Sequence, residues 1–154
     1  MPDVMRCAVA LGSNLGDRCA HLDFAVAKLQ PLLRRLRVSR YHDTVPVGAT
    51  KPQPLYLNAA AVGGTTLTAR ELLDALLAIE QARGRQRPYP KAPRTLDLDL
   101  ILFGESVIDE PGLIVPHPRF RERRFVLEPL AEIAPDLVDP ITHQTVAELA
   151  LSAR

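Results

Sequence analysis

The clearest pattern in the chain lies at residues 94–103, where polar and hydrophobic residues alternate before an unbroken apolar run. Alternation with a period of two predicts a β-strand with one buried face. Side chains two positions apart point the same way, so Thr95, Asp97 and Asp99 are expected to share the other face. The side chains expected to face a core are Leu96, Leu98, Leu100 and Leu102.

Similar patterns predict the rest of a small α+β domain. Strands are predicted at residues 6–11, 36–41 and 55–62. Apolar residues spaced three and four apart predict one helix that ends near Pro31 and another that begins at the capping box of Thr68 and Glu71. The order strand, helix, strand, strand, helix, strand is typical of a ferredoxin-like sandwich, an antiparallel sheet with helices on one face. The opposite sheet face is then free for a functional site.

The segments between these elements are expected to be loops. Residues 42–54 contain four prolines or glycines in a short stretch and are predicted to form one long loop of functional importance. The glycine-containing residues 103–107 are predicted to form a hairpin turn, from which the chain returns through residues 107–108.

Two more helices are predicted towards the C-terminus. An apolar stripe predicts a helix at residues 123–134, bent or restarted at Pro129. A second capping box, formed by Thr145 and Glu148, predicts a short helix after it.

The two carboxylates of the first strand are candidate metal ligands. Asp97 and Asp99 would lie roughly 6–7 Å apart and would repel each other unless a cation lies beside them. Hard oxygen ligands without nearby Cys or His suit Mg²⁺. A solvated acidic strand face is the simpler alternative for such a pair. The preceding residues favour a metal–polyphosphate site, because they include Arg83, Arg85, Arg87, Lys91 and Arg94.

A third carboxylate, Glu80, continues the apolar stripe of the second helix. Two interpretations remain open from the pattern: Glu80 points inward, or it turns to solvent and pairs with Arg83 or Arg87. An inward carboxylate at the C-terminal end of a helix opposes the macrodipole, which would indicate a function.

Composition limits the classes of function. The chain of 154 residues has a net charge of +1, which gives no general attraction to nucleic acid or to a membrane surface. No apolar run approaches the ~18 residues of a membrane span, and the N-terminus has no signal-peptide pattern. Cys7 and Cys19 have no disulfide or metal spacing. We therefore expect a single catalytic domain over residues 1–154, cytoplasmic and monomeric, with reduced cysteines.

The segment Pro93-Arg94-Thr95-Leu96-Asp97-Leu98-Asp99 resembles the signature of the 6-hydroxymethyl-7,8-dihydropterin pyrophosphokinase family of folate biosynthesis. Matching segments follow in the family's order along nearly the whole chain, at residues 11–16, 56–59, 79–87, 115–117, 123–127 and 132–136. The resemblance implies a ferredoxin-like fold and transfer of diphosphate from ATP to the hydroxymethyl oxygen of the pterin, with release of AMP. It also implies two Mg²⁺ ions held by Asp97 and Asp99.

The resemblance further implies roles for individual residues. Arg85, Arg94, Asp97 and Asp99 are expected to be catalytic. The residues expected to bind ATP are Glu80, Arg85, Arg87, Arg94, Leu100, Ile114, His117 and Arg123. Those expected to bind the pterin are Thr44, Val45, Val47, Tyr56, Asn58, Asp97 and Phe125, with the rings of Tyr56 and Phe125 on either side of it. Many members carry Arg-Trp-Gly before the signature, whereas this chain has Pro90-Lys91-Ala92 and a shorter segment.

Two other functions share some of these features. An RNA-recognition module has the same order of elements, but it would carry aromatic and basic side chains on the sheet face where this chain has Asp97 and Asp99. A two-metal phosphohydrolase would use the same pair of aspartates. We expect small-molecule substrates and neither nucleic acid nor membrane as a partner.

Overall fold

The computed structural model describes residues 3–45, 55–84 and 95–153, and it contains a five-stranded antiparallel sheet. Four strands lie in the order β2–β4–β1–β5, and β3 pairs with β4 beyond β2. Their bounds are β1 (Met5–Ser13), β2 (Arg34–Val38), β3 (His42–Thr44), β4 (Tyr56–Thr65) and β5 (Asp97–Phe103). This order is that of the predicted ferredoxin-like sandwich, and the α+β fold class is confirmed.

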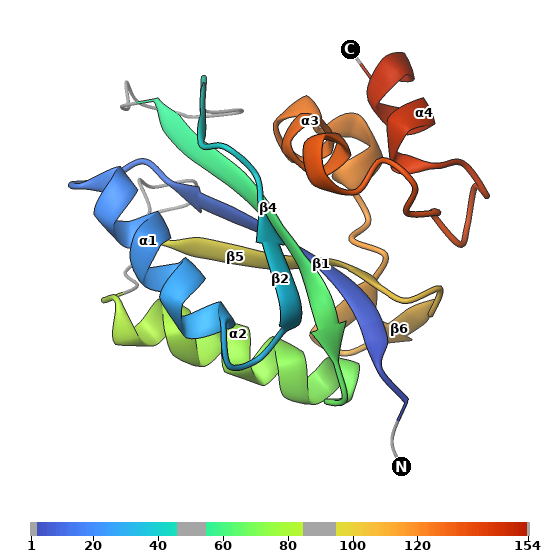
Figure 1. The fold of residues 1–154 in the computed structure, drawn as a ribbon, viewed down its shortest axis with the longest axis horizontal. Helices are drawn as coiled ribbons and strands as arrows, with labels where there is room; N and C mark the ends of the chain where they lie inside the picture. Colours follow the sequence, from blue (N-terminus) through green and yellow to red (C-terminus); the bar gives the residue numbers. More distant parts are fainter. Residues whose placement is uncertain (1–2, 46–54, 85–94, 154) are drawn as a thin grey trace.

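Helices α1 (Arg18–Leu29) and α2 (Ala69–Ala82) cover one face of the sheet (Figure 1). Asp17 caps α1 by accepting a hydrogen bond from the Ala20 amide, and Thr68 and Glu71 form the predicted capping box of α2. The apolar stripes of both helices pack on alternate residues of the central strands. The large, fully buried side chains of this core include Leu11, Leu22, Leu29, Leu72, Leu76 and Leu96.

The second face of the sheet is covered at one end only. Helix α3 (Arg124–Ile133) and helix α4 (Val146–Ser152) pack there, on the opposite side from α1 and α2 (Figure 1). The sandwich therefore has helices on both faces and not on one face as predicted, because the chain continues beyond the six elements of the basic fold. Pro129 lies within α3, which runs through it as one helix. The core at this end includes Ala8, Ala60, Val62, Ile101, Leu102, Phe120, Leu127 and Leu130.

The expected facing of Leu102 was wrong. Leu98 and Leu100 pack under α1 and α2, but Leu102 belongs to the core beneath α3. The pairing of β1 with β5 passes from Leu100 to Leu102 and skips Ile101, which is a β-bulge. An extra residue in one strand reverses the side-chain alternation beyond it, so the period-two pattern holds only as far as Leu100.

Three predicted boundaries also need correction. The strand predicted at residues 36–41 ends at Val38 as β2, and residues 39–41 lie between β2 and β3. Both strands pair with β4. Residues 42–44 are therefore strand and not loop. After the turn at Gly104, the chain does not return along β5. Instead β6 (Ile108–Glu110) pairs with β7 (Leu113–Val115) as a separate hairpin.

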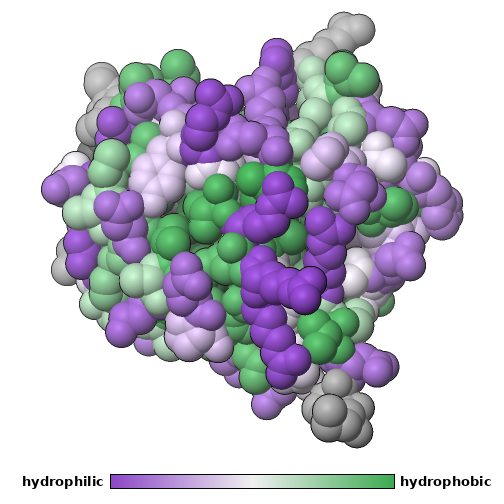
Figure 2. Space-filling view, viewed as in Figure 1, coloured by the Kyte–Doolittle hydropathy of each residue, from purple (hydrophilic) through white to green (hydrophobic). Residues whose placement is uncertain are grey.

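The exposed edge of the sheet at β2 is basic. Arg34, Arg35 and Arg37 are all exposed, and charged side chains on an edge strand hinder pairing with another chain. Figure 2 shows hydrophilic side chains around and across a patch of hydrophobic atoms near the middle of the face viewed in Figure 1. Among the described residues, no helix is long and apolar enough to cross a membrane.

Candidate functional site

The candidate site lies at the open end of the second sheet face, where polar residues form a row across three strands. Gly12 of β1 is paired with Asn58 of β4 on one side and with Asp97 of β5 on the other. Two residues away along β1, on the same face, Ala10 is flanked by Ala60 and Asp99. Strands lie ~4.8 Å apart, so the Cα atoms of Asn58 and Asp97 are about 10 Å apart across the row.

The middle of this row has room above the strand, because β1 contributes the small residues Ala10 and Gly12 there. A Cβ atom at Gly12 would lie 3.3 Å from Asn58 Oδ1 and 3.4 Å from two ring carbons of Tyr56. Glycine therefore lets Tyr56 and Asn58 lie over the backbone of β1. Sequence reasoning placed Gly12 only in a turn motif, because the role depends on which strands flank β1.

Asn58 and Thr44 form the polar edge beside Tyr56. Asn58 is buried, and its Nδ2 donates a hydrogen bond to Thr44 Oγ1 on β3. Because the amide donates there, its Oδ1 faces Gly12. Phe125 lies in the first turn of α3, with the guanidinium of Arg123 5.6 Å from its ring centroid. The structure thus brings Thr44, Tyr56 and Asn58 to one end of the second face, whereas Phe125 packs against the core beneath α3. Val45 follows β3 with 74% of its surface exposed.

Glu132, on α3, holds the start of β3. Its carboxylate accepts hydrogen bonds from the Arg40 amide at 2.6 Å and from Arg40 Nε at 3.1 Å, and it lies 3.2 Å from His42 Nε2. The hydrogen bond from the Arg40 backbone amide lowers the pKa of Glu132, although burial raises it. Hydrogen bonds from the side chains of Arg40 and His42 lower this pKa further. The sequence carried no signal for this contact, which joins residues far apart in the chain.

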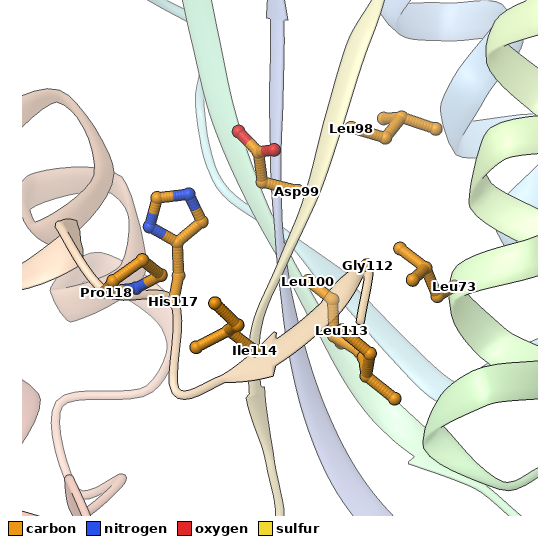
Figure 3. Close-up of a pocket in the computed structure, with 9 residues that line it drawn as sticks. All are labelled: Leu73, Leu98, Asp99, Leu100, Gly112, Leu113, Ile114, His117 and Pro118. Atoms are coloured by element: carbon orange, nitrogen blue, oxygen red, sulfur yellow. The ribbon is translucent and has the colours of Figure 1, made fainter. Parts of the chain in front are cut away.

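On the other side of the row, Asp99 and His117 point towards one another (Figure 3). Asp99 comes from β5, and His117 follows β7 after a cis Val115–Pro116 bond. The His117 amide donates to the carbonyl of Ile101 at 2.9 Å, so the β-bulge that turns Leu102 over also fixes His117 beside β5. Leu73 and Leu98 lie on the helix side of the same strand (Figure 3).

A cavity of about 250 Å³ opens between β5 and the β6–β7 hairpin. Pockets for drug-sized ligands have volumes of about 300–1,000 Å³, so this smaller cavity accommodates one part of a nucleotide and not all of it. Its lining contains predicted ATP-binding residues from β5, β7 and the following segment. The lining residues are Leu73, Leu98, Asp99, Leu100, Gly112, Leu113, Ile114, His117 and Pro118.

His117 is held in a neutral state with a defined donor. Burial lowers its pKa, the guanidinium groups of Arg123 and Arg119 lower it further, and Asp97 opposes them. His117 Nδ1 accepts a hydrogen bond from the Arg119 amide at 3.2 Å. A neutral imidazole with an accepting Nδ1 carries its proton on Nε2, so His117 offers one N–H donor to an anion.

Glu80 points inward, which decides between the two interpretations of its position. It is 1% exposed, and its Oε2 accepts a hydrogen bond from the Leu98 amide at 2.6 Å. This bond joins the end of α2 to β5 between the two aspartates. Arg83 donates from Nε to His21 Nδ1 at 2.8 Å and lies over the ring of Phe24.

The donor set suits a hard divalent cation that also binds phosphate. Asp97 and Asp99 are half-buried carboxylates on one strand face. Within the described residues, no group of three or more His, Cys, Asp or Glu could hold a metal ion. Mg²⁺ is commonly held by one or two carboxylates and by substrate phosphates. The pair fits that mode and not an all-protein metal site.

Several predicted residues lie outside the described ranges. They are the pterin-side Val47 and the ATP-side Arg85, Arg87 and Arg94. The segment Pro90-Lys91-Ala92, which differs from the family pattern, also lies outside the described ranges.

The model of the family 7,8-dihydro-6-hydroxymethylpterin-pyrophosphokinase matches residues 8–135 of this chain. Similar proteins are named 2-amino-4-hydroxy-6-hydroxymethyldihydropteridine pyrophosphokinase. That of Pseudomonas aeruginosa is 44% identical over 87% of this chain and 83% of its own length. That of Bacillus subtilis is 46% identical over 81% of this chain and 75% of its own length.

Solved structures share the fold. Plasmodium falciparum HPPK-DHPS superposes with a TM-score of 0.75 at 13% identity, over 98% of this chain and 45% of that one. A similar region, 39% identical, occupies 19% of the Folic acid synthesis protein fol1 of Pneumocystis carinii. The match over residues 8–135 covers most of the chain, so this protein belongs to the 7,8-dihydro-6-hydroxymethylpterin-pyrophosphokinase family.

Proposed function

We propose that this member of the family works by joining two half-sites at the row Asn58–Gly12–Asp97. The overall reaction follows from the family: the chain is a pyrophosphokinase of folate biosynthesis that transfers diphosphate from ATP to hydroxymethyldihydropterin. The proposal concerns which residues perform it. The observation that carries it is that Asn58 and Asp97 flank Gly12 in one row across the sheet.

The pterin half-site lies around Tyr56 and Asn58. A flat bicyclic ring needs aromatic faces and polar groups at its edge. Tyr56 and Phe125 supply the faces, and Asn58 and Thr44 read the edge. Gly12 leaves the space in which Tyr56 and Asn58 lie over β1. Val45 completes this half-site through its backbone, and Val47 is a further residue at the edge of the ring.

The nucleotide half-site lies around the cavity of β5 and β7. Leu100 and Ile114 contact the adenine through their backbone, and Glu80 orients the adenosine part. His117 donates from Nε2 to a phosphate oxygen, and Arg123 adds a positive charge beside it. Arg87 binds phosphate in the same half-site, and Arg85 and Arg94 neutralise the charge that develops during transfer.

Asp97 and Asp99 would hold Mg²⁺, which would neutralise negative charge on the phosphates and make the β-phosphorus more electrophilic when bound. We expect two such ions. The hydroxymethyl oxygen of the pterin forms a bond to the β-phosphorus. The bond from that phosphorus to the oxygen bridging the α-phosphate breaks, and AMP leaves with this oxygen. The hydroxyl proton is released. Asp97 also contacts the pterin oxygen, since it shares a row with Asn58.

A nucleotide assay tests the proposal. The protein is incubated with ATP, MgCl₂ and 6-hydroxymethyl-7,8-dihydropterin, and the nucleotides are separated. We expect AMP in proportion to the pterin consumed, and none without pterin. A two-metal phosphohydrolase would release ADP or free phosphate without pterin. The matched variant Asn58→Ala is expected to raise the pterin KM and to leave the KM for ATP unchanged.

A cytoplasmic location, a monomeric state and a single catalytic domain over residues 1–154 are parts of the same proposal. The basic edge strand β2 supports the monomer, because its arginines oppose pairing between two copies. Size-exclusion chromatography with light scattering tests that part directly.

A further inference from the structure

We propose that Arg18 and Arg70 are positioning residues, each of which anchors one half-site to the first turn of a helix. Arg18 begins α1 and serves the pterin side, and Arg70 is the second residue of α2 and serves the nucleotide side. The inference rests on the proposed function, because it assumes where each substrate binds.

On the pterin side, one nitrogen of Arg18 joins two separate parts of the chain. Its Nη1 donates to Asp43 Oδ1 at 2.6 Å and to the carbonyl of Leu55 at 2.9 Å. Asp43 is the residue before Thr44 in β3, and Leu55 is the residue before Tyr56 in β4. A single guanidinium therefore binds the residues next to Thr44, which is proposed to contact the edge of the pterin, and next to Tyr56, which is proposed to contact its face.

On the nucleotide side, Arg70 makes the same kind of contact. Its Nη2 donates to Glu110 Oε1 at 3.1 Å and to the carbonyl of Pro111 at 3.1 Å. Its Nη1 would lie 3.6 Å from a Cβ built on Gly112, at the tip of the β6–β7 hairpin. This hairpin carries Leu113 and Ile114, which line the cavity.

Helix stability does not account for these two arginines. The positive end of the macrodipole lies at the N-terminus of a helix, where a cation is unfavourable and an anion is favourable. Residues that break a local rule are expected where the chain serves a function. In both cases the guanidinium leaves its helix and binds a segment of a half-site.

The segments that are anchored are the least supported strands of the fold. β3 has three residues at the edge of the sheet, and the β6–β7 hairpin is a two-stranded sheet of three-residue strands. Two-stranded hairpins are marginally stable on their own in water. Glu132 holds only the start of β3. Arg18 and Arg70 therefore reduce the conformational entropy that these segments would otherwise lose when a substrate binds.

Binding of each substrate to Arg18→Met and Arg70→Met tests the inference. The probes are 6-hydroxymethylpterin, followed by fluorescence, and α,β-methylene-ATP with MgCl₂, followed by calorimetry. This analogue resists cleavage at the bond that the reaction breaks. We expect Arg18→Met to raise the Kd for the pterin about five- to ten-fold and to change the Kd for the nucleotide less than two-fold. Arg70→Met is expected to give the reverse.

Matched variants separate positioning from general stability. Arg6→Met removes another arginine–carboxylate pair, with Asp136, and is expected to change neither Kd. Asp43→Asn and Glu110→Gln remove one partner each with less risk to folding, and they are expected to shift the same Kd as the corresponding arginine variant. Arg18→Lys and Arg70→Lys are expected to recover part of the affinity, because an ammonium retains charge and donors.

Equal changes in both constants, or no change in either, would overturn the inference. Asn58→Ala and His117→Ala identify which proposal has failed. If Asn58→Ala leaves pterin binding unchanged, or His117→Ala leaves nucleotide binding unchanged, that half-site is wrongly assigned and its arginine anchor fails with it. If both weaken binding but the arginine variants do not, only the anchoring inference is wrong.

Discussion

The two ends of the second sheet face are built on the same three strands and have opposite characters. At the closed end, under α3 and α4, the strands contribute Ala8, Val62 and Leu102 to a core. At the open end the same strands contribute Gly12 and Asn58 with Asp97 and Asp99. A few residues along each strand separate a packed interior from a polar site.

The difference shows how stability and function are divided within one sheet. Burial of apolar surface stabilises by about 25 cal/mol per Å², and the closed end buries most of its surface. Half-buried carboxylates such as Asp97 and Asp99 contribute no such term. Substitutions at the open end are therefore expected to reduce binding and catalysis, and substitutions at the closed end are expected to reduce stability.

The largest effect is expected at the open end from Asp97→Ala and Asp99→Ala. Each removes a carboxylate that would hold Mg²⁺, so we expect turnover to fall by about 1,000-fold or more, in line with the several kcal/mol that a metal contributes to charge stabilisation. Single-turnover formation of AMP measures the loss. Thermal melting is the control, and near-wild-type turnover in either variant would refute the metal assignment.

At the closed end, Leu102→Ala is expected to lower the free energy of unfolding by about 3 kcal/mol, because it leaves a cavity beneath α3. Turnover per folded molecule at low temperature should stay close to that of the unchanged protein. Urea denaturation measures the stability. The matched deletion at a site 89% exposed, Leu151→Ala, should cost less than about 0.5 kcal/mol. A large loss of turnover in Leu102→Ala would contradict the division between the two ends.

The closed end also depends on a buried ion pair between Arg121 and Asp139. Burial would raise the pKa of Asp139, but hydrogen bonds from Arg121, Thr142 and the Ile141 amide outweigh it and hold the pKa at about 2. The guanidinium of Arg121 also lies 4.9 Å from the centroid of the Phe120 ring. The pair thus joins the segment before α3 to the segment before α4.

Because the ordinary pKa is 3.8 and the folded value is about 2, the ionised Asp139 stabilises the fold by about 2 kcal/mol above pH 4. This contribution is lost as the pH falls from about 4 to below 2, since the unfolded chain binds the proton first. Urea unfolding at several pH values measures it. Asp139→Asn should remove most of this pH dependence, and an unchanged slope would contradict the assignment.

The smallest effect is expected from Gly12→Ala at the open end. The added Cβ would press on Asn58 and on the ring of Tyr56 at 3.3–3.4 Å, so both must shift by a few tenths of an ångström. We expect the Kd for 6-hydroxymethylpterin to rise about threefold, less than 1 kcal/mol. The Kd for α,β-methylene-ATP is the internal control, and an equal rise in both would place Gly12 outside the pterin half-site.

Much of the fold could be predicted because its signals are local. The capping boxes at Thr68 and Thr145 depend on residues three apart, and both are present. The alternation around Asp97 and Asp99 predicted their common strand face. The errors lie where a distant contact decides. β6 pairs with β7 and not with β5, and β3 continues the edge strand after Ser39 because β4 is long enough to pair with both.

Local patterns in the sequence identified the aspartate pair as a candidate site, and the family motifs implied which residues are expected to bind a flat ring. Their placement in one row was decided by the tertiary structure, because strand register joins Gly12 to Asn58 and to Asp97 across long stretches of chain. The facing of Leu102, the anchor for His117 at Ile101 and the contacts of Arg18 and Arg70 also arise only there. Local patterns report how a residue relates to its chain neighbours, whereas these features depend on which strands and helices pack together.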